Sequence, residues 1–157
     1  MIILLDLNYT LVGNSRETFI GFQPDIEREQ YRLPLIGLLQ QHHVALVTHR
    51  GKEHEAATLQ GLRDKAHWCP AEWHFNDRGW TAPRWKEFVL VERIWKVHGQ
   101  VAQILAIESN LKTAEMYERH GLMVLKVVRD GSGNRADVAE LAHQKTPPKK
   151  EAGLFIK

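Results

Sequence analysis

The stretch IILLDLNYT, residues 2–10, carries the pattern that decides the fold of this chain. It opens with four consecutive apolar residues, a length and composition typical of a strand buried on both faces of a parallel sheet. Comparable apolar runs occupy residues 44–47, 104–107 and 123–128, and a weaker one occupies residues 72–75. These five runs predict the strands of one sheet.

Helical segments separate the predicted strands. Apolar side chains recur at helical spacing in four segments, residues 33–43, 52–63, 85–98 and 111–120. The last two are followed by Gly99 and Gly121, and glycine commonly ends helices. Alternation of strands and helices favours an α/β fold, in which a three-layer, Rossmann-like parallel sheet has helices on both faces and minimal or no cap.

Length and composition are those of one domain. The chain has 157 residues, of which 43% are hydrophobic and 25% are charged, and its net charge is +2; these values are ordinary for a globular protein. We expect the domain to span residues 1–145, followed by a loosely ordered tail at residues 146–157. Residues 13–32 are mixed and polar, and they form either a flap over the sheet edge or a long connection.

Cysteine and histidine usage limits the metal chemistry that the sequence predicts. The single cysteine, Cys69, can form neither an internal disulfide nor a cysteine-based zinc cluster. The nine histidines show no paired spacing within one element, so we expect no zinc site. No apolar stretch is long enough to span a membrane, and the apolar N-terminus is too short for a signal peptide. We therefore expect a cytoplasmic protein with no membrane partner and no obligate protein partner.

Polar residues follow the predicted strands at the points where those strands end. Asp6, Thr48 and Glu108 each come directly after an apolar run, and Asn76 or Asp77 follows the weaker run. Because the carboxyl ends of parallel strands meet at one edge, and ligands bind in the crevice there, we expect these side chains to face one another. A carboxylate at such an edge can attack phosphorus without prior deprotonation. Alternatively, Asp6 only ends the strand or caps a helix.

These segments resemble, in content and order, the motifs of the haloacid dehalogenase (HAD) superfamily of phosphohydrolases. Residues 6–10 match the Asp-x-Asp-x-Thr motif of that family, with Asn8 in place of the second aspartate. The resemblance extends over about residues 1–128. Three later motifs are matched by Thr48, Lys86 and the pair Glu108-Ser109.

The resemblance implies an aspartyl-phosphate mechanism that uses Mg²⁺. Asp6 would attack phosphorus, and Thr48 and Lys86 would bind the phosphoryl oxygens. The magnesium ligands implied by the motifs are Asp6, the backbone carbonyl of Asn8, and the fourth motif, Glu108-Ser109. A hard cation and an ammonium group suit phosphoryl transfer, which needs positioning and charge neutralisation.

Two departures from the family pattern affect the expected rate. In the family, the second aspartate protonates the leaving oxygen and later activates water, and the amide of Asn8 can do neither. Loss of such acid–base help typically lowers rates by about 10²–10⁴. Ser109 replaces the second of two adjacent acids, which weakens the expected metal affinity. The chain is therefore either a slow phosphatase or a domain that binds phosphate without cleaving it.

Cationic side chains near the motifs indicate the class of substrate. Their arrangement resembles the polynucleotide 3′-phosphatase branch of the superfamily, in which arginines at comparable places hold the phosphate of a nucleic-acid end. This resemblance implies a nucleotide, another phosphorylated small molecule or a phosphorylated nucleic-acid end as substrate. Arginine binds phosphate well, and tryptophan rings can stack on bases; alternatively, the basic loop around Trp80 and Trp85 is only a solvated surface with tryptophans packed beneath it. The implied substrate contacts are Thr10, Arg16, His49, Arg50 and Arg84.

An unrelated doubly wound domain is the remaining alternative. In a flavodoxin-like or receiver-like domain, Asp6 would be structural or would accept a phosphoryl group. A receiver is expected to show two acids near its first strand, and no acid precedes Asp6. A flavin or dinucleotide site is not indicated, because no glycine-rich fingerprint follows any predicted strand.

Overall fold

The computed structural model describes residues 1–15, 24–100 and 102–128 and contains the predicted parallel sheet. All five strands run in the same direction, in the spatial order β3-β2-β1-β4-β5. Their bounds are β1 Ile2–Leu5, β2 His43–Gly51, β3 Glu72–Asn76, β4 Ile104–Glu108 and β5 Met123–Lys126. The sheet confirms the α/β fold class expected from the five apolar runs.

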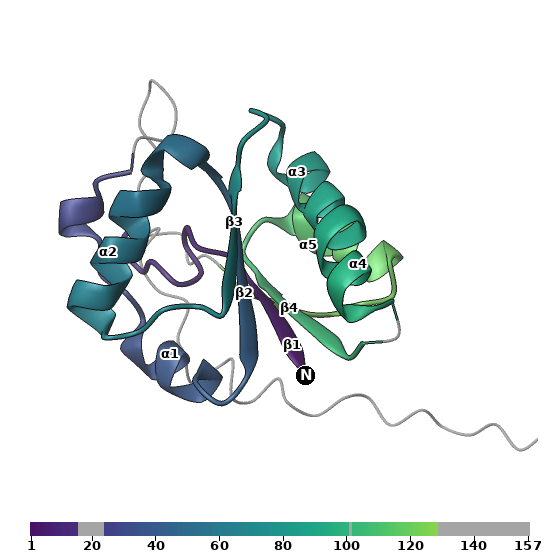
Figure 1. The fold of residues 1–157 in the computed structure, drawn as a ribbon, viewed down its shortest axis with the longest axis horizontal. Coiled ribbons are helices and arrows are strands. Elements are labelled where there is room, and N and C mark those ends of the chain that lie inside the picture. Colours follow the sequence, from purple (N-terminus) through teal and green to yellow (C-terminus); the bar gives the residue numbers. More distant parts are fainter. Residues whose placement is uncertain (16–23, 101, 129–157) are drawn as a thin grey trace, which may run out of the picture.

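Helices cover both faces of the sheet (Figure 1). Helices α1 and α2 lie on one face, and α3, α4 and α5 lie on the other. Their bounds are α1 Leu33–Leu39, α2 Glu55–Ala66, α3 Ala82–Val89, α4 Trp95–His98 and α5 Leu111–Arg119, with short 3₁₀ turns η1 at Ile26–Arg28 and η2 at Lys52–His54 and a π-helical segment η3 at Leu90–Ile94. In the described part of the chain, none of the helices combines the length and the apolar character needed to cross a membrane.

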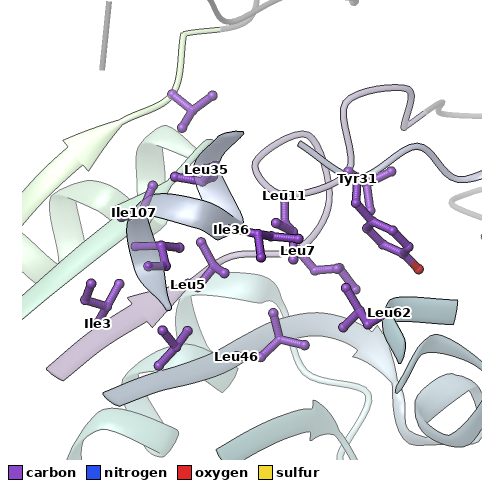
Figure 2. Packing of buried hydrophobic residues seen from close by; sticks show 14 of the residues in the cluster. Ile3, Leu5, Leu7, Leu11, Tyr31, Leu35, Ile36, Leu46, Leu62 and Ile107 are labelled. Carbon is purple, nitrogen blue, oxygen red and sulfur yellow. The ribbon is translucent and has the colours of Figure 1, made fainter. Parts of the chain in front are cut away.

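Alternation along β1 divides the core between the two faces. Ile3 and Leu5 pack in the cluster formed with α1 and α2, shown in Figure 2. Ile2 and Leu4 belong to the other cluster, which contains the buried Trp85 of α3. Because β1 is buried on both faces, it must be apolar at every position, which explains the uninterrupted run in the sequence.

Several element bounds differ from those expected. The segment 33–43 is helical only to Leu39, because the residues that follow are polar and the chain must pair with β1 from His43 onward. The segment 85–98 is not one α-helix, since the π-helical η3 divides it. Strand β2 continues beyond its apolar run, so that Thr48 lies inside the strand rather than after it.

The order of the connections reverses between β1 and β4. The chain passes from β1 to β2 and β3 at one edge, and then crosses to β4 on the other side of β1. In open α/β sheets, ligands bind beyond the carboxyl ends of the strands at such a reversal. Asp6 directly follows β1 and Glu108 ends β4, so both lie at this point.

The segment 13–32, expected as a flap or a long connection, is described in part. The ammonium of Lys65 in α2 donates to the backbone carbonyl of Ile26 at 2.8 Å, which ties the end of this segment to the helix. Several parts of the expectations lie outside the described residues, namely residues 16–23 with Arg16, residues 129–145 at the end of the expected domain, and the tail at residues 146–157.

Candidate active site

A buried lysine joins two carboxylates at the carboxyl ends of β1 and β4. The ammonium of Lys86, in α3, lies 2.7 Å from Oδ1 of Asp6 and 2.6 Å from Oε2 of Glu108. These residues are only 1%, 7% and 2% exposed, respectively. The structure therefore brings together three of the residues predicted from the sequence, although 80 positions separate Lys86 from Asp6.

Packing of the neighbouring Trp85 positions Lys86. The indole is fully buried in the core cluster beneath α3, and its N–H donates to the backbone carbonyl of Thr48 at 2.9 Å. The helix begins with Ala82 and Pro83, and proline is favoured in a first helical turn. The indole thereby fixes α3 against β2, and the next side chain along the helix, Lys86, reaches the carboxylates.

The three charges change one another's proton affinity. Burial alone would lower the pKa of Lys86, but the Asp6 and Glu108 carboxylates raise it above its usual value. Burial, together with repulsion from Asp6, raises the pKa of Glu108 to about 7, and the ammonium of Lys86 opposes this rise. The ammonium thus stays charged, whereas Glu108 titrates near neutral pH, as carboxyl groups at functional sites and in buried ion-pair networks both do.

A turn after β1 brings a further hydroxyl to Asp6. Tyr9 in this turn has a φ of 62°, a left-handed conformation that is costly for residues other than glycine. Its backbone N–H donates to Oγ of Ser15 at 2.9 Å, and Nε of Arg32 donates to the carbonyl of Thr10 at 2.9 Å. With the turn held in this way, the hydroxyl of Thr10 donates to Oδ2 of Asp6 at 2.7 Å.

Two oxygens lie next to the hydroxyl of Ser109, at spacings that are compatible with ligands of a hard divalent cation. Oγ of Ser109 lies 3.0 Å from Oδ2 of Asp6 and 3.1 Å from the backbone carbonyl oxygen of Asn8. Neighbouring oxygens in an octahedron around Mg²⁺, each about 2.1 Å from the ion, are about 3 Å apart. Glu108, also expected as a ligand, instead accepts a hydrogen bond from the backbone N–H of Asn110 at 2.8 Å and contacts the lysine ammonium with its other oxygen.

Arg50 lies in a buried ion pair. Its guanidinium contacts the carboxylate of Glu29, and it donates to Oγ1 of Thr58 at 2.8 Å and to Oδ1 of Asn8 at 2.8 Å. The residue is 3% exposed, and the hydroxyl of Tyr31 donates to Glu29 at 3.2 Å. The sequence predicted Arg50 as a substrate contact; the structure directs its charge to Glu29 and to the side chain of Asn8.

Sequence reasoning missed the partners of this arginine. Glu29 lies in a polar segment without periodicity, and Thr58 lies on the inner side of α2. The one signal for Glu29 is that it is an acidic residue in the connection that returns to β2, where a buried arginine needs a counter-charge.

A cavity of about 840 Å³ opens beside the turn that follows β1. His49 lines this cavity, and its Nε2 lies 2.8 Å from the carbonyl oxygen of Trp80. Thr48 is fully buried, and its hydroxyl accepts a hydrogen bond from the backbone N–H of Arg50 at 3.1 Å. Other lining residues come from the first turn, the end of β2, η2 and the loop after β3, and include Asn8, Lys52, His54 and Asp77.

Arginine side chains stack on aromatic rings next to this cavity. The guanidinium of Arg84 lies 4.2 Å from the ring centroid of Trp80, and that of Arg78 lies 4.9 Å from the same centroid. Arg78 also lies 4.4 Å from the centroid of Phe88. These distances are within the range of cation–π attraction. The two tryptophans predicted in this loop thus have different positions, since Trp85 is core and Trp80 is half-buried among cations.

Comparisons with known proteins give little beyond this geometry. No protein-family model matches the chain, and no curated protein matches it. Among solved structures, the chain is similar to a hypothetical protein from Xanthomonas campestris, with 18% identity and a TM-score of 0.49 over 89% of this chain and 68% of that chain.

Proposed function

We propose that this protein is a Mg²⁺-dependent phosphoric monoester hydrolase that forms an aspartyl-phosphate at Asp6, as the HAD-like motifs imply. The proposal is carried by the buried contact of Lys86 with both Asp6 and Glu108 at the point where the strand order reverses. Phosphoryl transfer depends mainly on positioning and charge neutralisation. A fixed ammonium beside a nucleophilic carboxylate supports both.

The proposed reaction consists of two displacements at phosphorus. A carboxylate oxygen of Asp6 forms a bond to phosphorus while the bond from phosphorus to the ester oxygen breaks, and the released alkoxide takes a proton from water. Water then attacks the acyl phosphate, releases inorganic phosphate and regenerates the carboxylate. In both steps Lys86 offsets negative charge, and hydrogen bonds from Thr10 and Ser109 orient Asp6.

The oxygens of Asp6, Asn8 and Ser109 are the proposed ligands of Mg²⁺. When bound, the cation supplies positive charge that offsets the phosphoryl oxygens. Glu108 contributes to the site by holding Lys86 in place. Because the set contains one carboxylate, one carbonyl and one hydroxyl, we expect weaker Mg²⁺ binding than in sites with several carboxylates.

Asn8 makes the proposed enzyme slow. Its amide can neither protonate the leaving oxygen nor activate water, and a group that does both typically contributes about 10²–10⁴ to the rate. The hydrogen bond from Arg50 to Oδ1 fixes the amide in its orientation.

A nucleotide or a phosphorylated nucleic-acid end is the proposed substrate, and the cytoplasm the proposed location. Arg78, Arg84 and Trp80 form a cationic and aromatic surface beside the cavity that Asn8 lines. Arginine forks bind phosphate oxygens, and an indole face accepts a stacked base.

Binding of the same ligands without turnover is the second candidate function. It is favoured by the buried pairing of Arg50 with Glu29, which holds an amide where a catalytic acid is expected. In this alternative, the site recognises a phosphoryl group and releases it unchanged.

The two candidates are distinguished by assays with Mg²⁺ and p-nitrophenyl phosphate, nucleoside monophosphates and 3′-phosphorylated oligonucleotides. Hydrolysis predicts Mg²⁺-dependent phosphate release that Asp6→Asn abolishes. Asp64→Asn, at an exposed position of α2, is the matched control and should leave the rate unchanged. Thermal melting checks that both variants fold. Phosphate-sensitive binding of oligonucleotides without release supports the second candidate, and absence of both binding and release contradicts both.

The role assigned to Asn8 has its own test. Asn8→Asp should raise turnover, because it introduces a group that can transfer protons. The new carboxyl would face Arg50, which favours its ionised form and weakens it as an acid. We therefore expect a gain of about tenfold, below the full range of acid–base catalysis. An unchanged or lower rate in a folded variant contradicts the role.

A further inference from the structure

Four side chains with metal-binding atoms gather at the end of the sheet opposite to the candidate active site. His43 opens β2, Glu72 opens β3, His74 lies two residues further along β3, and His98 ends α4. His43 precedes Thr48 by five residues on the same strand. That separation corresponds to roughly 16 Å along β2, so the two clusters are distinct.

Strand periodicity explains why these residues meet. Ala45, two residues after His43, packs in the cluster under α3 to α5. Glu72 pairs in register with Ala45, and His74 lies two residues beyond Glu72, so all of them are on that same face. The last residue of α4, His98, lies on this face as well, beside the starts of β2 and β3.

Glu72 is at the centre of the cluster. Its Oε1 lies 2.9 Å from Nε2 of His43 and 2.9 Å from Nε2 of His98. One ligand atom from each of these three residues lies within 4.8 Å of the others. Oε2 of Glu72 lies 3.5 Å from Nε2 of His74, a buried atom with no hydrogen-bond partner among the described residues.

We propose that His43, Glu72 and His98 form a binding site for Zn²⁺. Two imidazole nitrogens and one carboxylate oxygen are a known type of zinc ligand set, with a fourth position open to water. Ligand atoms at about 2.0–2.1 Å in a tetrahedron around Zn²⁺ are about 3.3 Å apart. Binding therefore requires each imidazole nitrogen to move a few tenths of an ångström away from Oε1. It also requires the nitrogens of His43 and His98, which lie within 4.8 Å of each other, to stand about 3.3 Å apart. The side chains of His43, Glu72 and His98 are 40%, 24% and 21% exposed, respectively, so the ion can enter from solvent.

His74 is a positioning residue in this site. Its Nδ1 lies 3.4 Å from Nη1 of Arg93, and because a guanidinium only donates, the ring proton belongs on Nε2, facing Glu72. Neighbouring polar groups orient carboxylates that bind metals, and Nε2 of His74 is the neighbour that lies 3.5 Å from Oε2 of Glu72. Arg93 also pairs with Asp77 at 3.2 Å, which partly offsets its repulsion of a bound cation.

Zn²⁺ at this place would tie the end of α4 to two strands. Strand β3 is at the edge of the sheet, and α4 is a short helix that follows the π-helical η3. An ion bound by the folded state alone stabilises it, because the ligands are dispersed in the unfolded chain. We therefore expect Zn²⁺ to raise the melting temperature of the protein.

The test uses the full chain without a histidine tag, stripped of metal and titrated with Zn²⁺ against a chromophoric chelator. We expect one equivalent to bind and the melting temperature to rise. His74→Phe removes an orienting neighbour and should weaken Zn²⁺ binding by roughly 10–100-fold. His98→Asn removes a ligand and should weaken binding by more than that. His67→Asn is the matched control with unchanged binding, since His67 is exposed and asparagine tolerates its φ of 49°.

Asp6→Asn separates this site from the candidate active site and should retain the bound Zn²⁺. Absence of binding at micromolar Zn²⁺ overturns the proposal, as does binding that His98→Asn and Glu72→Gln leave intact. Binding lost in Asp6→Asn but kept in His98→Asn would place the ion at the other end of the sheet and also overturn it. Circular dichroism of each variant shows whether it is folded.

Discussion

At the carboxyl ends of β1 and β4, Lys86 places an ammonium between two carboxylates, whereas at the amino ends of β2 and β3, Glu72 lies between two imidazoles. The first cluster is almost fully buried, and the second is partly open to solvent. A buried, ionised carboxylate needs a counter-charge, and the ammonium of Lys86 supplies one. The carboxylate of Glu72 is partly solvated and lies within hydrogen-bond distance of two imidazoles, so it does not depend on a fixed cation of the protein.

This difference shows that burial determines which kind of charged group can lie at the centre of a polar cluster. At the buried end the central charge belongs to the protein, and in the proposed function it offsets the charge of a phosphoryl group. At the open end the central group is the carboxylate of Glu72, which can bind a proton or a metal ion. Substitutions that remove the central or flanking charges therefore distinguish the two ends of the sheet.

The largest expected effect on the free energy of unfolding is that of the substitution Lys86→Met. This change leaves the carboxylates of Asp6 and Glu108 buried together without a cation, and loss of one partner from a buried ion pair typically costs about 3–5 kcal/mol. We expect a loss near the upper end of that range in the free energy of unfolding at pH 7, measured by urea denaturation. Lys112→Met, at an exposed position of α5, should change it by less than about 0.5 kcal/mol. Equal effects of the two changes would show that the buried cluster does not depend on its ammonium.

A smaller loss is expected for Arg50→Ala. The change leaves Glu29 buried without its guanidinium, but the hydroxyl of Tyr31 still donates to that carboxylate. We therefore expect a loss of about 3 kcal/mol, the lower end of the range for a broken buried pair. Arg84→Ala, at an exposed position, should leave stability unchanged and weaken binding of phosphorylated oligonucleotides. The reverse result, with Arg50→Ala affecting only ligand binding, would support the prediction that Arg50, which also lines the cavity, is a substrate contact.

One physical rule predicted two members of the buried cluster from the sequence, whereas Lys86 was expected only from the resemblance to the HAD motifs. Uninterrupted apolar runs indicate parallel strands, and parallel strands bring their carboxyl ends to one edge. Asp6 and Glu108 could therefore be placed together without knowledge of any contact. The same rule did not predict the end of the helix at Leu39 or the π-helical η3, because such details depend on packing rather than on periodicity.

The sequence could not predict the histidine cluster or the partner of Arg50. The ligands of the proposed zinc site come from β2, β3 and α4, so no spacing within one element reveals them. Glu29 lies in a segment without periodic pattern, and its contact with Arg50 spans 21 positions. Such contacts between side chains follow from the packed fold and leave no signal in a single sequence.

The next prediction concerns the pH dependence of stability. The pKa of Glu108 is raised to about 7 by burial and by Asp6, against about 4.3 in an unfolded chain. Between these pH values the native protein holds a proton that the unfolded chain has lost. The associated stabilisation is therefore complete below about pH 4.3 and is lost as the pH rises through about 7, with a slope of up to about 1.4 kcal/mol per pH unit. Glu108→Gln should remove this slope from urea denaturation curves recorded between pH 5 and 8, whatever its effect on absolute stability. An unchanged slope contradicts the assignment.

The smallest effect is expected from substitution of Glu72. Its contribution to the pH dependence of stability has the opposite sign to that of Glu108. Burial raises the pKa of Glu72, but hydrogen bonds from His43 and His98 outweigh burial and lower the pKa below its usual value. The native protein therefore releases this proton more readily than the unfolded chain, whose pKa is about 4.3. The linked stabilisation is present above that pH and is lost as the pH falls through the folded value. In EDTA, Glu72→Gln should make the acid limb of the stability curve less steep, by less than about 1 kcal/mol because solvent screens the pair. Glu115→Gln, at an exposed position, should leave that limb unchanged. If Glu72→Gln and the native protein lose stability equally between pH 5 and 3, the two ends of the sheet do not differ in the way that their burial implies.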